Sequence, residues 1–313
     1  MKLIIKKIAS LFATLIIVSL ITFLAFQVIP GDSVLISLGT NATEEAIEQR
    51  REELGLNENV FVRYFKWLGN AAKGDFGTSS QYHIKVSELI GERLSITIWL
   101  TIISVVFVLL ISIPLGILAS NRVDGWIDRI VVFLTQITMA IPPFFLGIII
   151  TLIFGFILRL FTPGRFYYPA ESFNKFISFM VFPGLAIAIP KIAMVVKFLR
   201  SSIIRQLDTD YVRTAKSKGH TRAGIMYNHV LKNALIPVIT FIAMVIADIL
   251  ANSIIIEEVF GIPGLGRLLV MSISNRDYAV VQAIVLLIVI IIVFLNFVVD
   301  ILYQYLDPKV RIK

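Results

Sequence analysis

The stretch Asp210-Tyr-Val-Arg-Thr-Ala-Lys-Ser-Lys-Gly219 lies inside a basic segment, residues 197–232, which separates two long apolar runs. Charged side chains and irregular backbone between two membrane spans have to leave the lipid, because unpaired charge and unsatisfied backbone groups are costly there. Loops rich in lysine and arginine stay on the cytoplasmic side of the membrane. The segment therefore predicts an integral membrane protein whose most basic loop faces the cytoplasm.

Composition supports the membrane class. The 313 residues are 57% hydrophobic and only 16% charged. We attribute the net charge of +8 to positive-inside topology next to anionic lipid rather than to nucleic-acid binding. The absence of cysteine excludes disulfides, a thiol nucleophile and a Cys-based metal site. The three histidines, His83, His220 and His229, lack metal-site spacing, so no metal is expected.

Six apolar runs approach the ~20 residues that a membrane crossing requires. They are residues 8–29, 94–119, 130–158, 176–199, 234–256 and 278–303. The first is longer than the apolar core of a signal peptide, about 7–15 residues, and no A-x-A cleavage site follows it. We therefore expect a retained span and, with six crossings, both termini in the cytoplasm.

This topology divides the chain into four parts. We expect an N-terminal transmembrane helix at 1–29, an extracellular loop domain with short helices at 30–93, a five-helix core at 94–306 that includes the loop 200–233, and a cytoplasmic tail at 307–313. In the loop domain, Asn41-Ala-Thr-Glu44 resembles a capping box, and Gly55 would close the helix that follows.

A second helix of the loop domain is indicated by an apolar stripe at helical spacing. The stripe consists of Val60, Phe61, Tyr64, Phe65 and Leu68. Such stripes are usually buried against a neighbour. We expect this one to pack on the membrane domain rather than to bind a ligand.

Prolines are expected to interrupt several spans, because proline removes a helix donor and kinks the chain. They occur in Ile141-Pro142-Pro143 of the third span, at Pro183 and Pro190 of the fourth, and at Pro114 near the inner end of the second. Membranes tolerate such breaks where neighbouring helices or a cavity satisfy the freed groups. A bundle that bends around a pathway fits this pattern, as does the ordinary occurrence of proline in transmembrane helices.

Asp248 is an acidic residue in the middle of a span, where a charge is a functional candidate by default. Asn252 follows one turn later, so the two residues either line a pathway or form a structural hydrogen-bonded pair. Gln136 and Met139, beside the third-span kink, are further pathway candidates. Lys191 is expected near a membrane interface.

Tyr211, Ala215 and Gly219 fall at i, i+4 and i+8, so they share one face of a helix in the basic loop. The small Ala215 side chain would allow another surface to approach, and Gly219 can adopt a left-handed turn. A second helix is expected at about 221–231. The loop is then either a lever along the cytoplasmic face or a solvated segment that only sets topology.

These residues carry a resemblance to a known family. Tyr211 to Gly219, followed by Asn233-Ala-Leu-Ile-Pro237-Val, is similar to the loop of ABC importer permeases in the dipeptide, oligopeptide and nickel branch. The general family pattern, Glu-Ala-Ala, three residues, Gly, nine residues, Ile-x-Leu-Pro, is matched only at Ala215, Gly219 and Leu231. Arg213 stands in the acidic position.

Three other stretches resemble the same branch in the same order. They are Arg63-Tyr-Phe-Lys-Trp-Leu-Gly69 with Gly74-Asp-Phe-Gly-Thr-Ser79, then 258–269 with 275–278, and Leu306-Asp-Pro-Lys-Val-Arg311. Each is weak alone, but together they cover nearly the whole chain. They resemble the permease subunit that has the long first extracellular loop.

The resemblance implies an all-α, six-transmembrane-helix type I ABC importer permease in the bacterial inner membrane, with a cytoplasmic coupling helix. Its implied partners are a homologous second permease, two cytoplasmic ATPases that bind ATP and Mg, an extracellular substrate-binding protein and the lipid bilayer. The implied cargo is a peptide, with nickel or a metal–metallophore complex as the alternative. The residues expected to couple to the ATPases are Tyr211, Arg213, Ala215, Lys218 and Gly219.

The resemblance also implies that the outside segments form the docking surface for the binding protein. The candidate residues are Trp67, Asp75, Pro263, Gly264 and Arg267. The apolar, turn-rich segment 262–266 is equally consistent with a re-entrant turn that only packs, with Leu265 and Leu268 anchored in lipid or protein.

Missing motifs limit the alternatives. The sequence has no P-loop, no H-E-x-x-H and no G-x-S-x-G, so we expect neither a cofactor nor catalysis in this chain, and energy for transport has to come from another polypeptide. An ion-coupled secondary transporter remains the competing class, although no internal repeat is evident and Asp248 is the only mid-span acid. An intramembrane enzyme would lack its catalytic dyad.

Overall fold

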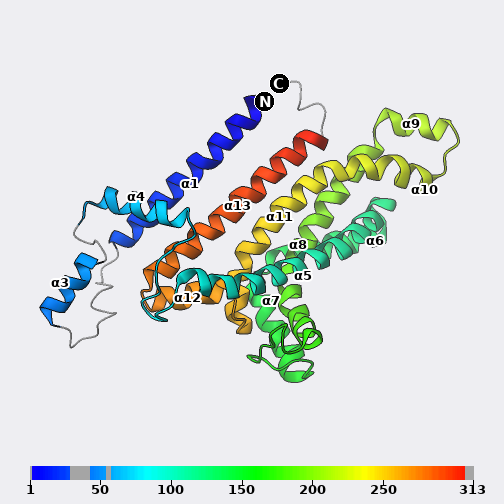
Figure 1. Cartoon of the computed structure of the whole chain (residues 1–313). Helices are drawn as coiled ribbons and strands as arrows, with labels where there is room; N and C mark the ends of the chain where they lie inside the picture. Colours follow the sequence, from blue (N-terminus) through cyan, green and yellow to red (C-terminus); the bar gives the residue numbers. More distant parts are fainter. Residues whose placement is uncertain (1, 29–42, 54–57, 307–313) are drawn as a thin grey trace. The chain divides into compact units, whose positions relative to one another are not determined.

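A computed structural model describes residues 2–28, 43–53 and 58–306 (Figure 1). Within these ranges the chain is helical, and its only β-type pairing is a single bridge between Thr78 and Lys85, so the predicted all-α class is confirmed. The helices are α1 (Lys2–Val28), α3 (Glu44–Glu53), α4 (Val60–Ala71), α5 (Val86–Asn121), α6 (Trp126–Ala140), α7 (Pro143–Ile150), η1 (Thr151–Ile157), α8 (Phe173–Leu207), α9 (Asp210–Ser217), α10 (Arg222–Ile225), η2 (Met226–Val230), α11 (Leu231–Phe260), α12 (Leu265–Ser274) and α13 (Tyr278–Leu306). Asn41 and Gly55, the predicted caps of α3, lie outside the described residues.

Four described helices are long and apolar enough to cross a membrane. They are Val86–Asn121, Phe173–Leu207, the continuous run Arg222–Phe260, and Tyr278–Val299. Helix α6 and the following Pro143–Ile157 form a fifth span if the bent pair is counted as one, and the described apolar part of α1, Ala9–Ala25, is shorter. The membrane class is therefore confirmed, whereas the predicted number of six is not matched by length and composition alone.

The third predicted span is broken, as the Ile141-Pro142-Pro143 sequence predicts. A residue before proline is pushed out of the helical region. Ile141 and Pro142 each precede a proline, and both are extended, with ψ of 123° and 141°. Two successive extended residues end α6, and the next helix leaves at an angle of 98°.

The fourth predicted span behaves differently. The prediction that Pro183 and Pro190 interrupt it is wrong, because α8 runs unbroken from Phe173 to Leu207. A single proline removes one backbone hydrogen bond, and packing can compensate for that loss. In the most apolar window of α8, 72% of the residues are buried inside the protein. Pro114 likewise lies within the continuous helix α5.

The described residues form two compact units, one within residues 2–96 and 263–294 and the other within residues 97–262 and 295–306. The core of the first unit joins the start of α5 to α12 and α13. It contains Val86, Leu89, Ile90, Leu265, Leu268, Val280, Ala283 and Ile284, with Phe76 and Tyr82 packed against it. Leu265 and Leu268 are thus anchored in protein.

Helix α4 packs on α1 through only part of its apolar stripe. The Tyr64 side chain is buried, and its hydroxyl lies 2.8 Å from Ser19 Oγ. Phe61 and Phe65 remain exposed. The packing prediction therefore holds for Tyr64 and not for these two phenylalanines.

The second unit is built around α8. Glycines bring α5 close to it, because a Cβ added at Gly116 would meet Leu199 Cδ2 at 2.7 Å and one added at Gly184 would meet Ile103 Cγ2 at 2.8 Å. Small residues allow such close helix packing in membranes. Helix α11 runs alongside α8, and the α9–α10 hairpin projects where these two helices are joined (Figure 1).

Candidate functional site

The basic loop folds as two short helices around Gly219. Helix α9 ends at Ser217, and Gly219 adopts φ +81°, which confirms the predicted left-handed turn. The turn is closed by backbone bonds, since His220 N donates to Ala215 O at 3.2 Å. Thr221 then caps α10 by accepting from Gly224 N at 3.2 Å. The chain therefore reverses over four residues with a defined backbone.

The structure does not leave Ala215 open to another surface, as its small side chain had suggested. Val212 and Ala215 are buried within the chain, whereas Arg213 and Lys218 are exposed. The close approach that the small Ala215 side chain permits is thus used inside the protein, and the surface left open is basic. Whether this surface receives an ATPase stays a prediction.

The loop is attached to the spans at several points. Arg222 donates a hydrogen bond to the carbonyl of Asn121, the last residue of α5. Tyr211 donates to Gln206 Oε1 near the end of α8 at 2.8 Å. A displacement of the loop would therefore act directly on both helices.

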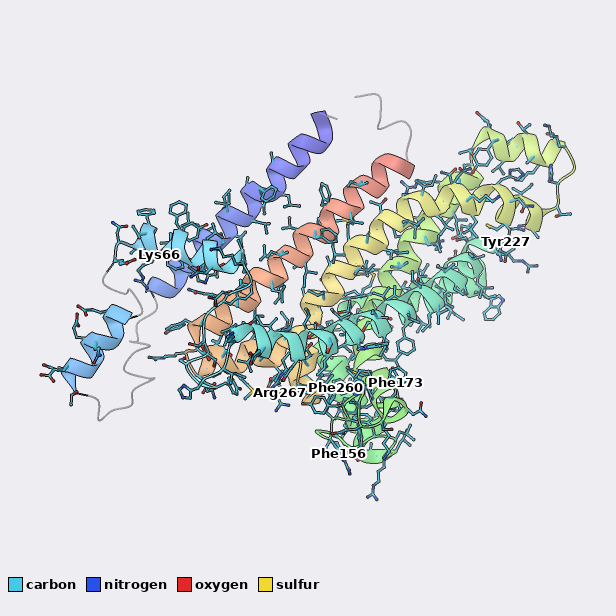
Figure 2. The ribbon with its side chains drawn as sticks, viewed as in Figure 1. Lys66, Phe156, Phe173, Tyr227, Phe260 and Arg267 are labelled. Carbon is cyan, nitrogen blue, oxygen red and sulfur yellow. The ribbon has the colours of Figure 1, made fainter. Side chains whose placement is uncertain are left out.

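The predicted second helix at 221–231 is in fact one turn of α10, followed by the π-helical η2 and then α11 without a break. Figure 2 shows Tyr227 of η2 and Phe260 at opposite ends of this run. Single π-turns inside α-helices are frequent at functional sites. Ser202 Oγ donates to Ala234 O at 2.9 Å and ties the start of α11 to α8.

The pathway candidate Asp248 lies on α11 and forms an ion pair with Lys191 of α8. Lys191 Nζ donates to Asp248 Oδ2, and Asn252 Nδ2 donates to Oδ1 at 3.0 Å. The lysine side chain is 9% exposed and the aspartate side chain 46% exposed. The expectation that Lys191 lies near an interface is wrong, because it is buried in the middle of α8 as the partner of Asp248.

A second ion pair was not anticipated. Arg200 of α8 binds Asp128 of α6 with both carboxylate oxygens engaged, Nε–Oδ1 at 2.5 Å and Nη2–Oδ2 at 2.6 Å. Asp124 N also donates to Oδ2, at 2.8 Å. Arg200 lies within the basic segment 197–232, and no sequence pattern joins it to an acid 72 positions earlier.

Gln136 and Met139 both lie on the exposed side of α6. Gln136 borders a cavity of about 90 Å³ between α6 and α8, whose lining also includes Thr135, Lys197 and Arg200. Met139 does not line it. Valines from both helices also contribute to the lining, so the cavity wall mixes apolar and polar side chains.

Glu257 is a further buried acid, which lies one residue beyond the predicted span 234–256 and was therefore not a candidate from the sequence. It lies in the last turn of α11 and is completely buried. Thr97 Oγ1 donates to Glu257 Oε1 at 2.6 Å. This contact joins α5 to α11 within the second unit.

The two segments predicted to lie outside the membrane meet in the first unit. Ser79 donates to the buried Asp277 carboxylate, and Asn275 Nδ2 donates to Gln81 Oε1 at 2.7 Å. We call these four residues the outer clasp. It joins the segment before α5 to the segment before α13 by side-chain hydrogen bonds.

The docking candidates differ in exposure. Asp75 is exposed and accepts from Gly77 N at 3.0 Å. Pro263 and Arg267 are half-buried, and Gly264 is buried at the start of α12. Trp67 is half-buried, with its ring centroid 5.8 Å from that of Phe23. Their role as a docking surface stays a prediction.

Among the described side chains, no group of three or more His, Cys, Asp or Glu residues is arranged to hold a metal ion. His220 and His229 lie together in the loop, with ring centroids 5.6 Å apart. Two imidazoles with no acidic third ligand do not form a typical metal site.

Comparison with known families decides the class. Residues 112–312 match the binding-protein-dependent transport system inner membrane component, and residues 1–101 match the N-terminal domain of the same membrane components. The chain belongs to this family. Members are transport subunits that span the membrane several times, which agrees with the apolar helices found here.

Several relatives match almost end to end. The oligopeptide transport system permease AppB of Bacillus subtilis (strain 168) is 35% identical over 94% of each chain. The probable peptide ABC transporter permease y4tP of Sinorhizobium fredii is 31% identical over 98% of each. The glutathione transport system permease GsiC of Escherichia coli (strain K12) is 35% identical over 99% of each. These relatives agree with the dipeptide and oligopeptide branch.

A solved structure shows the same fold. The inward-facing MetNI methionine ABC transporter matches with a TM-score of 0.55 and 18% identity, over 70% of this chain and 96% of the other. At this identity the likeness concerns the fold alone. It confirms the architecture of a type I ABC importer permease.

Proposed function

We propose that the chain is the permease subunit with the long first extracellular loop in an ATP-driven importer, and that it passes peptides from an extracellular binding protein into the cytoplasm. The observation that carries this proposal is the end-to-end similarity to permeases named for oligopeptides, peptides and glutathione. Both termini and the α9–α10 loop lie in the cytoplasm in this proposal. A homologous second permease completes the membrane part.

In this proposal two separate ATPases bind ATP and Mg and act on the α9–α10 loop. The contact residues are Tyr211, Arg213, Ala215, Lys218 and Gly219, with the exposed Arg213 and Lys218 facing the partner. Closure of the ATPases pulls the loop, and the loop moves α5, α8 and α11 because it is bonded to the first two and continuous with the third.

The remaining assignments extend the same scheme. The pathway is lined by Asp248, Asn252, Gln136 and Met139, which lie on α11 and α6 of the second unit. The binding protein docks on the first unit, where the outer clasp holds the two outside segments together. Nickel or a metallophore complex is the alternative cargo, and mass spectrometry of the ligand on the copurified binding protein distinguishes it from a peptide.

The Gly219→Pro variant tests the loop. Proline fixes φ near −65° and cannot adopt the +81° found at this position. We expect normal insertion and assembly, with loss of the ATP hydrolysis that peptide-loaded binding protein stimulates. Gly164→Pro is the matched control, since Gly164 also has positive φ, +77°, and open space around it but lies in the segment before α8. Full stimulation of Gly219→Pro would contradict the proposal.

A further inference from the structure

In the ion pair between Lys191 and Asp248, the base is buried and the acid is partly accessible, so Asp248 has an open side. The lysine side chain is almost fully enclosed, while nearly half of the aspartate side chain is accessible. Lys191 occupies Oδ2 and Asn252 occupies Oδ1. An ionised carboxylate accepts about four hydrogen bonds, so each oxygen retains the capacity to accept another. The open side of Asp248 is therefore able to bind a further donor.

The position of Asp248 decides what the open side faces. It lies 12 residues before Phe260, the last residue of α11, which at 1.5 Å per residue is about 18 Å from the end of the helix. This depth falls inside a hydrocarbon layer of about 30 Å. A charged group exposed to lipid at that depth is strongly disfavoured. The open side of Asp248 therefore faces water or a polar partner.

The same face of α11 carries Met244, Ala251 and Ile255, which share it with Asp248 at helical spacing. Met244 and Ile255 are exposed by 57% and 51%. Methionine adapts to ligands of different shape, and alanine leaves room next to the carboxylate. Asp248 is thus a single anionic group next to flexible apolar side chains. Such surroundings suit a ligand in which an ammonium group is joined to a variable side chain.

Building on the proposed function, we propose that Asp248 is a transit site for the cationic amino terminus of the peptide, and that Lys191 is the resident counter-ion. Lys191 keeps the carboxylate neutralised when the path is empty. Because the positive charge of Lys191 also repels an arriving ammonium group, Lys191 keeps the binding of that group weak. A transported ion has to bind well enough to enter and weakly enough to leave. The lysine therefore sets how long the substrate stays.

Neutralising Asp248 alone leaves Lys191 as a buried unpaired charge, so the decisive variant removes both charges. We expect the Lys191→Met/Asp248→Asn subunit, in complex with its ATPases in proteoliposomes, to assemble and to lose peptide uptake by about tenfold, which corresponds to one charge-assisted contact. Lys175→Met/Glu171→Gln is the matched control, because it removes one positive and one negative charge at exposed positions outside the proposed site. Wild-type uptake by the double variant would overturn the proposal.

A second measurement does not depend on uptake. A hydrophobic carbodiimide activates the Asp248 carboxyl in the wild-type complex, and mass spectrometry measures the reaction as the N-acylurea adduct or, with loss of water, as the Asp248–Lys191 amide. We expect N,N-dimethylbutylammonium, which cannot form an amide with the activated carboxyl, to protect Asp248, and the uncharged N,N-dimethylbutanamide to give no protection. In Lys191→Met, protection is expected at about tenfold lower concentration, since the repelling charge is gone. Equal protection in both proteins would refute the role of Lys191.

The outcomes separate this inference from the proposed function. If wild-type complex imports no peptide while ammonium still protects Asp248, the peptide function fails and the cation site stands. If peptide is imported but ammonium gives no protection, the site fails and the function stands. If the double variant separates from the second permease, Asp248 is a subunit contact, and the transit site is wrong.

Discussion

Helix α8 carries two ion pairs that differ in how far each encloses its acid. The pair formed by Arg200 and Asp128 is bidentate, and the Asp128 side chain is only 2% exposed. In the pair formed by Lys191 and Asp248, one lysine nitrogen contacts one oxygen, and the acid is 46% exposed. In the first pair, three side-chain and backbone donors bind the acid and it is buried. In the second, the base is hidden and the acid remains available.

The difference follows from the chemistry of the two bases and from their depth. Guanidinium presents a planar fork that matches both carboxylate oxygens, whereas ammonium is a point charge on a flexible stem. Arg200 lies seven positions before the end of α8 at Leu207, and Lys191 lies sixteen positions before it. The closed pair therefore stabilises helix packing, and the open pair is suited to exchange partners.

Arg200→Met should have the largest effect on stability. It leaves Asp128 buried without a counter-charge, and breaking a buried pair in this way costs about 3–5 kcal/mol. We expect a large loss of folded subunit and a lower Tm in detergent. A double variant, Arg200→Met with Asp128→Leu, removes the stranded charge and should recover part of the loss. A wild-type Tm for Arg200→Met would show that the pair is not structural.

Arg200→Lys sharpens the comparison by changing geometry while keeping the charge. Lysine cannot reproduce two parallel contacts, so we expect a loss of about 1.5 kcal/mol, one charge-assisted hydrogen bond. The same thermal unfolding measurement applies, with Lys197→Arg at an exposed site as the control. A wild-type Tm for Arg200→Lys would show that the two-point contact of the guanidinium adds no stability, and that the two ion pairs differ only in burial.

Lys191→Met should have the smallest effect of the three. The half-open Asp248 can be solvated when its partner is lost, so we expect a decrease of about 1 kcal/mol, reduced by solvent screening. Thermal unfolding again gives the value. A larger loss than for Arg200→Met would reverse the ranking and remove the basis for treating Asp248 as the available acid.

Local sequence signals predicted the features that depend on neighbouring residues. The left-handed Gly219 follows from its lack of a Cβ, and the break at Ile141 follows from two successive prolines. The continuity of α8 through Pro183 and Pro190 could not be read locally, because it depends on the burial of that helix. The class of protein followed from hydropathy and from the motif around the loop.

Contacts between residues that are far apart in the sequence were the main features that the sequence did not predict. Lys191 and Asp248 are 57 positions apart, and no spacing rule connects them. The rule that singled out Asp248, a charge inside a span, applies equally to Lys191 and would have found it. The burial of Ala215 also depends on tertiary packing. Its spacing from Tyr211 and Gly219 predicted the helix correctly, but it did not predict that Ala215 is buried inside the chain.

The outer clasp restricts how this permease can be recombined with its relatives. Ser79 and Asp277 lie 198 positions apart, yet both are buried in one contact. A hybrid that takes its first loop from another permease and keeps the native last loop would place Asp277 against a side chain selected for a different neighbour. If these loops dock the binding protein, as proposed above, exchange of binding-protein specificity requires the grafting of both loops as a matched set.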